Sequence, residues 1–197
     1  MSSEIRVNTV NEGTSASGVT IDGVLIKDGL VDGKDVSTLA NSVAFSEVDA
    51  YVINTDITAD ELPIAGTKFT RHTGTLINYP IGSGMSVNST GHWTFPSTGF
   101  YEVTFIASVE NDTNSNATEI NILATDNNFV GTDTIAHARF YGNDNSRTTY
   151  QVKAIVDITD LSNDKVSFYF NEVNTSTLQG TTSEMLSGVM FVKIAST

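Results

Sequence analysis

The chain contains no cysteine and few basic residues. The absence of cysteine excludes disulfides, thiol nucleophiles and cysteine-ligated zinc sites, and it leaves the compartment open. The 10 Lys and Arg residues are outnumbered by 23 Asp and Glu residues, which gives a net charge of −13. Because the basic residues are not clustered, binding to nucleic acid or to an anionic membrane surface is not expected.

Long hydrophobic runs are also missing. No run approaches the roughly 18 apolar residues that a membrane-spanning helix requires, so membrane insertion is not expected. Residues 1–7 lack the basic and then apolar pattern of a secretory signal.

The chain is rich in small uncharged polar residues and poor in charged ones. Charged residues make up 17% of the chain, against about 25% in an average domain, whereas 27 Thr, 20 Ser and 17 Asn are present. Threonine favours strands, and Asn and Ser favour turns. The composition therefore predicts an all-β protein with many turns, since a helical bundle would be rich in Leu, Glu, Lys and Ala.

The charge distribution predicts two parts that divide near residue 66. Residues 1–65 hold 11 acidic and 3 basic residues (net −8), and residues 66–197 hold 12 and 7 (net −5). The first part has only two aromatic residues, Phe45 and Tyr51, which are too few for a core of its own. Residues 1–65 are therefore predicted to form an N-terminal arm, and residues 66–197 a globular head.

Three Asp-Gly pairs separate very short apolar runs within residues 18–36. They are Asp22-Gly23, Asp28-Gly29 and Asp32-Gly33. Asp-Gly favours tight turns because both residues tolerate positive φ. Strands of two to four residues cannot bury a face within one chain; copies wrapped around a shared axis can, and the alternative is a flexible acidic linker. The run Val24, Leu25 and Ile26 is more apolar than a linker requires and is predicted to belong to an attachment arm.

The segment from Val36 to Ile53 is ambiguous. Its apolar residues follow a spacing of three and four, which favours a short helix or a two-heptad coil. Alternation at Val48, Ala50 and Val52 favours a strand instead, and a helix or an irregular connector is the preferred interpretation. Pro63 ends any helix, and Gly66 opens the next unit.

From residue 66 onward, apolar and polar residues alternate with a period of two. The alternating runs are Phe100–Val109, Thr149–Ile158 and Val166–Phe170, and Met185–Ile194 is apolar on both faces. About eight to ten short strands in 130 residues predict an antiparallel sandwich or a jelly roll. Thr104 is predicted to face outward and to be exposed. The residues predicted to form the core or trimer contacts are Trp93, Phe95, Tyr101, Val103, Phe105, Phe168, Phe170, Val189 and Phe191.

Catalytic motifs are absent from the sequence. The histidines His72, His92 and His137 are scattered and do not form the His-Glu-x-x-His pattern of zinc hydrolases. Gly82–Ser86 lacks the fixed Gly-x-Ser-x-Gly spacing of a nucleophile elbow. Asp112–Asn116 begins like a calcium loop without its glycine and closing glutamate, so a polar hairpin tip is favoured. No catalytic residue, cofactor or metal is predicted.

Three segments of the predicted head follow one another like the motifs of a known fold. Trp93–Val103 contains an aromatic strand, a Gly-x-Tyr turn and the start of a long alternating strand. Leu161–Phe168 is similar to a later L-x-x-G-D-x-V segment, with Asn163 where glycine is usual, and Met185–Phe191 is similar to a closing strand. Residues 66–197 thus resemble the C1q and tumour-necrosis-factor-like jelly roll, and this resemblance implies a homotrimer.

The N-terminal segment resembles a different class of protein. Residues 3–10 and 18–29 are similar to the start of tail-fibre and other virion-surface proteins of bacteriophages, and residues 31–37 to a turn motif repeated in such fibres. This resemblance implies that the N-terminus attaches to the particle and that the head points outward. The lack of collagen-type Gly-x-y repeats separates the chain from the animal C1q-like proteins and groups it with the phage type.

These observations lead to three hypotheses of different classes. The first is a non-enzymatic, trimeric fibre or spike on the bacteriophage virion surface, made in the host cytoplasm. It binds another virion protein of the tail or capsid through residues 1–65 and contacts a host-surface glycan or protein through its head. The second is a capsid decoration or head-fibre protein that stabilises the shell. The third, a polysaccharide-active enzyme, is disfavoured because a catalytic constellation and a long β-helix are missing.

Overall fold

The computed structural model divides the chain into two units, Met1–Ala44 (the N-terminal unit) and Phe45–Thr197 (the C-terminal unit). In the N-terminal unit it describes the backbone of residues 19–21, 24–27, 30–31 and 34–35. In the C-terminal unit it describes residues 45–74, 77–111, 117–141, 146–171 and 176–196, without the side chain of Ile77. Among these residues, no helix is long and apolar enough to cross a membrane.

The described part of the N-terminal unit is a four-stranded antiparallel sheet with the order β1-β2-β3-β4. Its strands are β1 (Val19–Ile21), β2 (Val24–Lys27), β3 (Leu30–Val31) and β4 (Lys34–Asp35). The register pairs Ile21 with Val24, Lys27 with Leu30 and Val31 with Lys34. The three Asp-Gly pairs between these strands, which were predicted as turns, lie outside the described residues.

The C-terminal unit is built from two antiparallel sheets. The strands of the larger sheet are β5 (Val48–Ile53), β6 (Phe69–Arg71), β11 (Gly99–Asn111), β14 (Ser146–Ile158), β16 (Ser176–Leu178) and β17 (Gly188–Ala195). Those of the smaller sheet are β9 (Ser86–Val87), β10 (Trp93–Thr94), β12 (Ala117–Thr125), β13 (Asp133–Tyr141) and β15 (Lys165–Asn171). A 3-10 turn, η1 (Gly66–Lys68), and a hairpin of β7 (Thr73–Gly74) and β8 (Ile77–Asn78) complete the unit.

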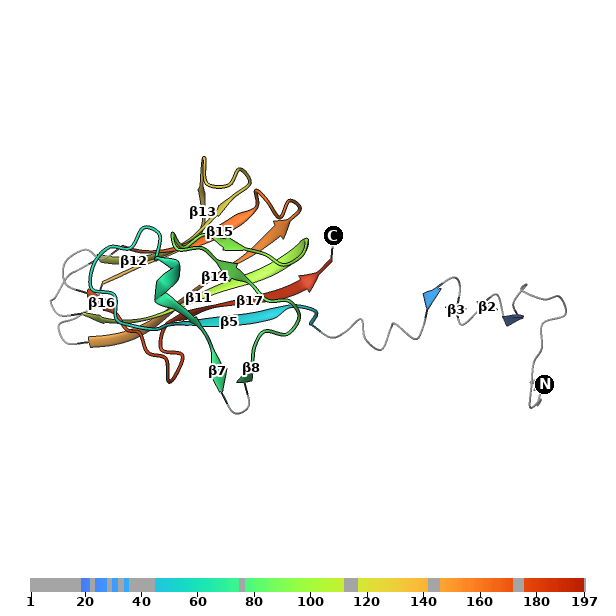
Figure 1. Cartoon of the computed structure of the whole chain (residues 1–197), viewed down its shortest axis with the longest axis horizontal. Helices are drawn as coiled ribbons and strands as arrows, with labels where there is room; N and C mark the ends of the chain where they lie inside the picture. Colours follow the sequence, from blue (N-terminus) through green and yellow to red (C-terminus); the bar gives the residue numbers. More distant parts are fainter. Residues whose placement is uncertain are drawn as a thin grey trace. The chain divides into compact units, whose positions relative to one another are not determined.

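The chain crosses repeatedly between the sheets, which is the connectivity of a jelly roll. The six-stranded sheet has the order β14-β11-β17-β5-β6 with β16 paired to β11, and the five-stranded sheet has the order β13-β12-β15-β10-β9. The two sheets form two layers, with β12, β13 and β15 above β11, β17 and β5 in Figure 1. The core lies between the layers, because alternate residues of every long strand point inward. The predicted all-β, antiparallel jelly-roll class is confirmed.

Strand β5 moves the division between the two units. Val48–Ile53 pairs antiparallel with β17, more than 130 residues later in the sequence, and all six of its residues are buried. The predicted helix or connector over this segment is therefore wrong, and the C-terminal unit begins at Phe45 rather than at Gly66. The alternation at Val48, Ala50 and Val52 was the correct signal, and the spacing of three and four that favoured a helix was misleading. Residues 36–44 lie outside the described residues.

The long strands agree with the predicted alternation, with one exception at Thr104. Tyr101, Val103 and Phe105 are fully buried and face the core. Thr104 faces away from the core, as predicted, but it is also fully buried, so its predicted exposure is wrong. Its strand is not at the edge of the sheet, and the register places Thr104 between Lys153 on β14 and Met190 on β17.

Candidate functional site: an apolar sheet face and an edge groove

All nine residues that were predicted to form core or trimer contacts are buried within a single subunit. Each is at most 2% exposed, so they form the core between the sheets and leave the subunit surface to other residues. Phe168 occupies the centre of an aromatic cluster that joins both sheets. The nine residues are Trp93, Phe95, Tyr101, Val103, Phe105, Phe168, Phe170, Val189 and Phe191.

The outward face of the six-stranded sheet exposes three large apolar side chains. Phe100 on β11, Ile155 on β14 and Ile194 on β17 are 37%, 64% and 48% exposed. Phe100 pairs with Asp157 on β14 and with Ala195 on β17, and Ile194 precedes Ala195 at an irregularity in that register. Together with the half-buried residues Ile106, Met190 and Val192, these three side chains make up what we call the apolar patch. Large apolar side chains exposed on one sheet face are typical of a protein interface.

Charged groups lie among the side chains of the apolar patch. On β14, the outward positions on either side of Ile155 are Lys153 and Asp157, both exposed. Glu102 lies between Ile155 and Val192 in the register, and Lys153 donates to it at 2.9 Å. This face therefore combines apolar side chains with paired charges, and protein interfaces contain both.

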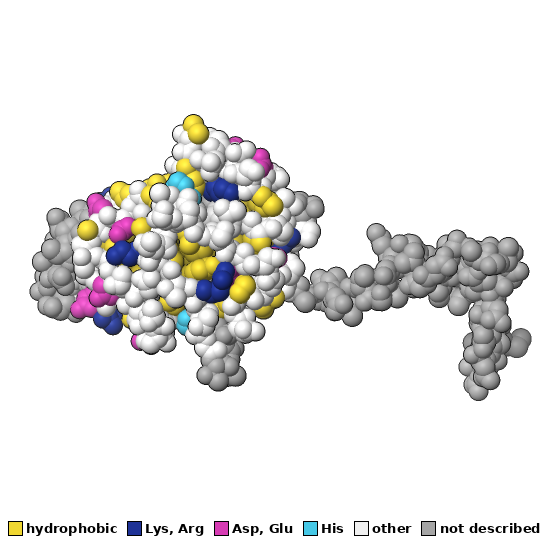
Figure 2. Space-filling model, viewed as in Figure 1, with side chains coloured by type: hydrophobic (Ala, Val, Ile, Leu, Met, Phe, Trp, Pro, Cys, Tyr) yellow, Lys and Arg dark blue, Asp and Glu magenta, His cyan; other side chains and the backbone are white. Residues whose placement is uncertain are grey.

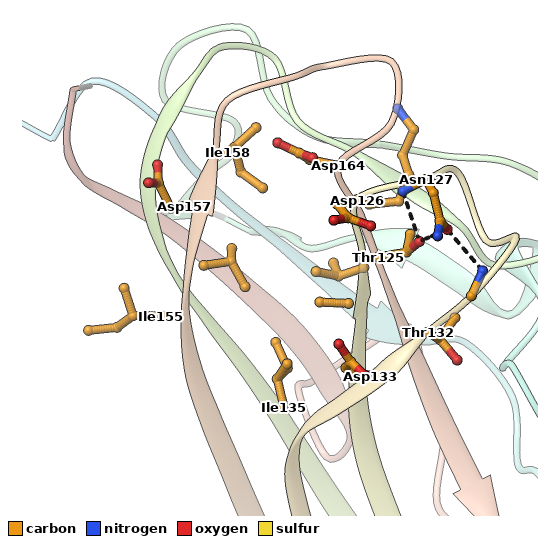
Figure 3. Close-up of a pocket in the computed structure, with 15 residues that line it drawn as sticks. Thr125, Asp126, Asn127, Thr132, Asp133, Ile135, Ile155, Asp157, Ile158 and Asp164 are labelled. Atoms are coloured by element: carbon orange, nitrogen blue, oxygen red, sulfur yellow. Dashed lines mark hydrogen bonds between the residues drawn. The ribbon is translucent and has the colours of Figure 1, made fainter.

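A groove of about 570 Å³ opens at one end of the sandwich, between the edge strands of the two sheets. It is formed by the last residues of β12, the first of β13, the last of β14 and the first of β15 (Figure 3). One rim is fixed locally, because the Thr125 hydroxyl donates to the Asn127 side chain at 2.7 Å and Gly131 N–H donates to it at 2.9 Å. The sequence carried no sign of the groove, since four distant segments form it.

The groove is negatively charged. Its lining includes four aspartates and a single cationic residue, Lys165, whose ammonium group donates to the Leu161 carbonyl. Asp164 is also engaged, because it accepts N–H groups of Thr159 and Asp160 at 2.7 Å each. The remaining aspartates are Asp126, Asp133 and Asp157, with Ile135 and Ile155 as apolar neighbours in Figure 3. Such a groove repels anionic ligands and admits neutral or cationic ones.

No metal site is formed by the residues that the structure describes. Groups of three or more His, Asp or Glu side chains with suitable geometry do not occur among them. His92 stacks on Phe129 with ring centroids 3.7 Å apart, and burial lowers its pKa. His137 lies 4.0 Å from Glu119 on the outside of the five-stranded sheet. Residues 112–116, the segment that began like a calcium loop, lie outside the described residues.

An ion pair between the buried Asp49 on β5 and the half-buried Arg71 on β6 joins neighbouring strands. Asp49, 2% exposed, accepts Nε and Nη2 of Arg71 at 3.0 Å each and the N–H of Met85 at 2.7 Å. Arg71 also donates to the Tyr51 hydroxyl, which donates to the Met85 carbonyl. Burial, reinforced by Asp49, raises the pKa of Tyr51 to about 12. The network is structural, and it could not be predicted from the sequence, since its members are up to 36 residues apart.

Comparison with known proteins identifies the fold. The structure matches that of Eiger TNF from S. frugiperda with a TM-score of 0.54 at 14% identity, over 78% of this chain and 96% of that one. It also matches murine APRIL at pH 5.0 with a TM-score of 0.54 at 11% identity, over 75% of this chain and 98% of that one. The fold is a TNF-like jelly roll. No protein-family model matches the chain, and no curated protein sequence matches it.

The TNF-like jelly roll accounts for the three motifs found in the sequence. The Gly-x-Tyr turn is the start of β11, where Gly99 has a φ of 138°. The L-x-x-N-D segment is the turn into β15, where Asn163, in place of glycine, donates from its side-chain amide to the Asp160 carboxylate at 2.8 Å. The Ser-Gly of the closing segment precedes and begins β17, where a Cβ on Gly188 would lie 2.2 Å from the Tyr51 carbonyl oxygen.

Proposed function

We propose that this chain is a non-enzymatic structural protein of a bacteriophage particle. In this proposal three copies form a short fibre or spike on the virion surface. The N-terminal unit attaches to another virion protein, and the TNF-like unit forms an adhesive head that contacts the host. The proposal joins the fold to the resemblance of residues 3–10 and 18–29 to phage tail-fibre proteins.

The apolar patch is the observation that carries the proposal. Phe100, Ile155 and Ile194 are exposed on one sheet face although a single chain has already buried nine large core residues. Exposing such a patch to water is unfavourable, and burying each side chain contributes roughly 1.5–3 kcal/mol. A closed ring of identical copies buries the patch of every copy at once. Self-association through this face therefore supports a trimeric head.

The remaining surface has the chemistry of a contact surface without catalytic groups. On the face shown in Figure 2, charged side chains are scattered. The edge groove offers carboxylates, the Asn127 amide and the Thr132 hydroxyl, which are groups that bind sugar hydroxyls and amines. These features support contact with a host-surface glycan or protein, with no cofactor.

Capsid decoration is the second candidate. The same two-unit chain suits this function. The N-terminal unit would bind the capsid shell, and the head would stabilise the shell or adhere weakly. A fibre is present in a few copies at one vertex or at the tail, whereas a decoration protein covers the shell. Copy number and position therefore distinguish the two.

The test is electron microscopy of the particle labelled with antibodies to the purified protein. The proposal expects label at the tail or at a few vertices, and label spread over the shell would favour decoration. Antibody pre-absorbed with the protein is the matched control. Particles that carry no specific label, with the protein detected by immunoblot only in the infected-cell lysate, would refute a virion role.

A further inference from the structure

We infer that the four-stranded sheet of the N-terminal unit is a second self-association module, whose aliphatic face packs against the same face of other copies. The inference begins from the backbone register. Val19 pairs with Ile26, Ile21 pairs with Val24, and Ile26 pairs on its other side with Val31. Paired residues and residues two apart occupy the same face of a sheet.

These pairings place five β-branched aliphatic residues on one face, which we call the aliphatic face. Its members are Val19, Ile21, Val24, Ile26 and Val31. Lys34, which pairs with Val31, lies at its margin on the last strand. The opposite, mixed face carries the other register positions, which are Thr20, Leu25, Lys27, Leu30 and Asp35.

The aliphatic face requires a second layer. A sheet with one apolar face is stable when that face is covered by another sheet or by a helix. Strands of two to four residues are too short to be stable without such cover. The described residues of the N-terminal unit include no further strand and no helix that would supply it.

Another copy of the chain is the occupant that the chemistry favours. An aliphatic face of one sheet is complementary to itself, and cyclic symmetry brings identical faces together around an axis. The segment between β4 and β5, residues 36–47, spans at most about 45 Å even when fully extended. Copies that associate through their C-terminal units therefore hold these sheets at a high effective concentration. The inference uses the proposed self-association for this step only, and it does not depend on the phage assignment.

The register also separates the three residues proposed for attachment. Val24 and Ile26 occupy the aliphatic face, whereas Leu25 occupies the mixed face. In this inference Val24 and Ile26 contact other copies of the chain. The mixed face then remains available to bind another virion protein.

Because the chain has no cysteine, single cysteines test the two faces cleanly. Ile26→Cys places a thiol on the aliphatic face, and Leu25→Cys is the matched control one residue away on the mixed face. Both are made in the full chain, without any particle present. The rate of modification by a polyethylene-glycol maleimide is read as a gel shift, in buffer and in denaturant, and the mass of each protein is measured by light scattering.

We expect Ile26→Cys to react at least about tenfold more slowly than Leu25→Cys in buffer, and equally fast in denaturant. Mild oxidation should convert Ile26→Cys, and not Leu25→Cys, to covalent dimers. Equal rates in buffer would overturn the inference. Protection of Ile26→Cys in a protein with the mass of one chain would also overturn it, since the cover would then come from the same chain. Particle labelling is a separate experiment, so failure of the phage proposal and failure of this module are distinguishable.

Discussion

Replacing Phe168 by alanine tests the register of the core most sharply. Phe168 is fully buried, and its ring centroid lies 5.4 Å from that of Phe105 on the opposite sheet. Its other aromatic neighbours are Phe69 at 6.3 Å, Trp93 at 6.0 Å and Phe191 at 6.0 Å. Both sheets contribute rings to this cluster, so neither sheet can fill the cavity left by Phe168→Ala without moving. The free energy of unfolding should therefore fall by an amount in the upper part of the usual range of about 3–5 kcal/mol.

The matched control is Tyr169→Ala on the same strand. Tyr169 is half-buried, faces away from the core and pairs with Asn121 in the register, so its loss should cost about 1 kcal/mol. In a unit of this size 1 kcal/mol corresponds to about 2–4 °C in Tm. Phe168→Ala should therefore lower Tm by about 8–20 °C and Tyr169→Ala by about 2–4 °C. Both are measured by circular dichroism at equal chain concentration. An equal or larger loss for Tyr169→Ala would refute the register.

Two further predictions concern the ion-pair network and the start of the C-terminal unit. The pKa of Tyr51 is raised from 10.0 to about 12 in the folded chain, so its stabilising effect is complete below pH 10 and is lost as the pH rises to about 12. In urea unfolding, the free energy of unfolding of Tyr51→Phe should fall less between pH 10 and about pH 12 than that of the wild type. An equal fall in both proteins would contradict this prediction. A chain that begins at Phe45 should fold. A chain that begins at Gly66 lacks β5 and exposes the edge of β17, so it should aggregate. A soluble, folded chain that begins at Gly66 would contradict this topology.

Alternation predicted most of the C-terminal unit because its long strands have one face in the core. Residues 100–109 and 149–158 were predicted as strands and form most of β11 and β14. The Asp-Gly turns stay predictions, since those residues lie outside the described part of the chain. Local sequence was therefore sufficient where alternation within one strand determined which residues face the core.

The candidate surfaces depend on register between distant strands, which local sequence does not contain. The apolar patch combines β11, β14 and β17, and the pairing of β11 with β17 shifts between Phe100 and Tyr101. The exposure of Thr104 was mispredicted because Thr104 lies on a strand with neighbours on both sides, β14 and β17, which local sequence does not reveal. Strand β5 was missed because its alternation was outweighed by a helix-like spacing over residues 36–53, and its pairing with the distant β17 cannot be read from local sequence.

The mass of the full chain in solution, measured by light scattering at micromolar concentration, tests the central claim most directly. Self-association through the apolar patch predicts three times the 21.1 kDa of one chain. Ile155→Asp, at the most exposed position of the patch, should reduce that mass. Gln151→Asp, an exposed polar position on the same face of β14, should not. A folded wild-type chain of 21.1 kDa, or an Ile155→Asp protein with unchanged mass, would contradict the account.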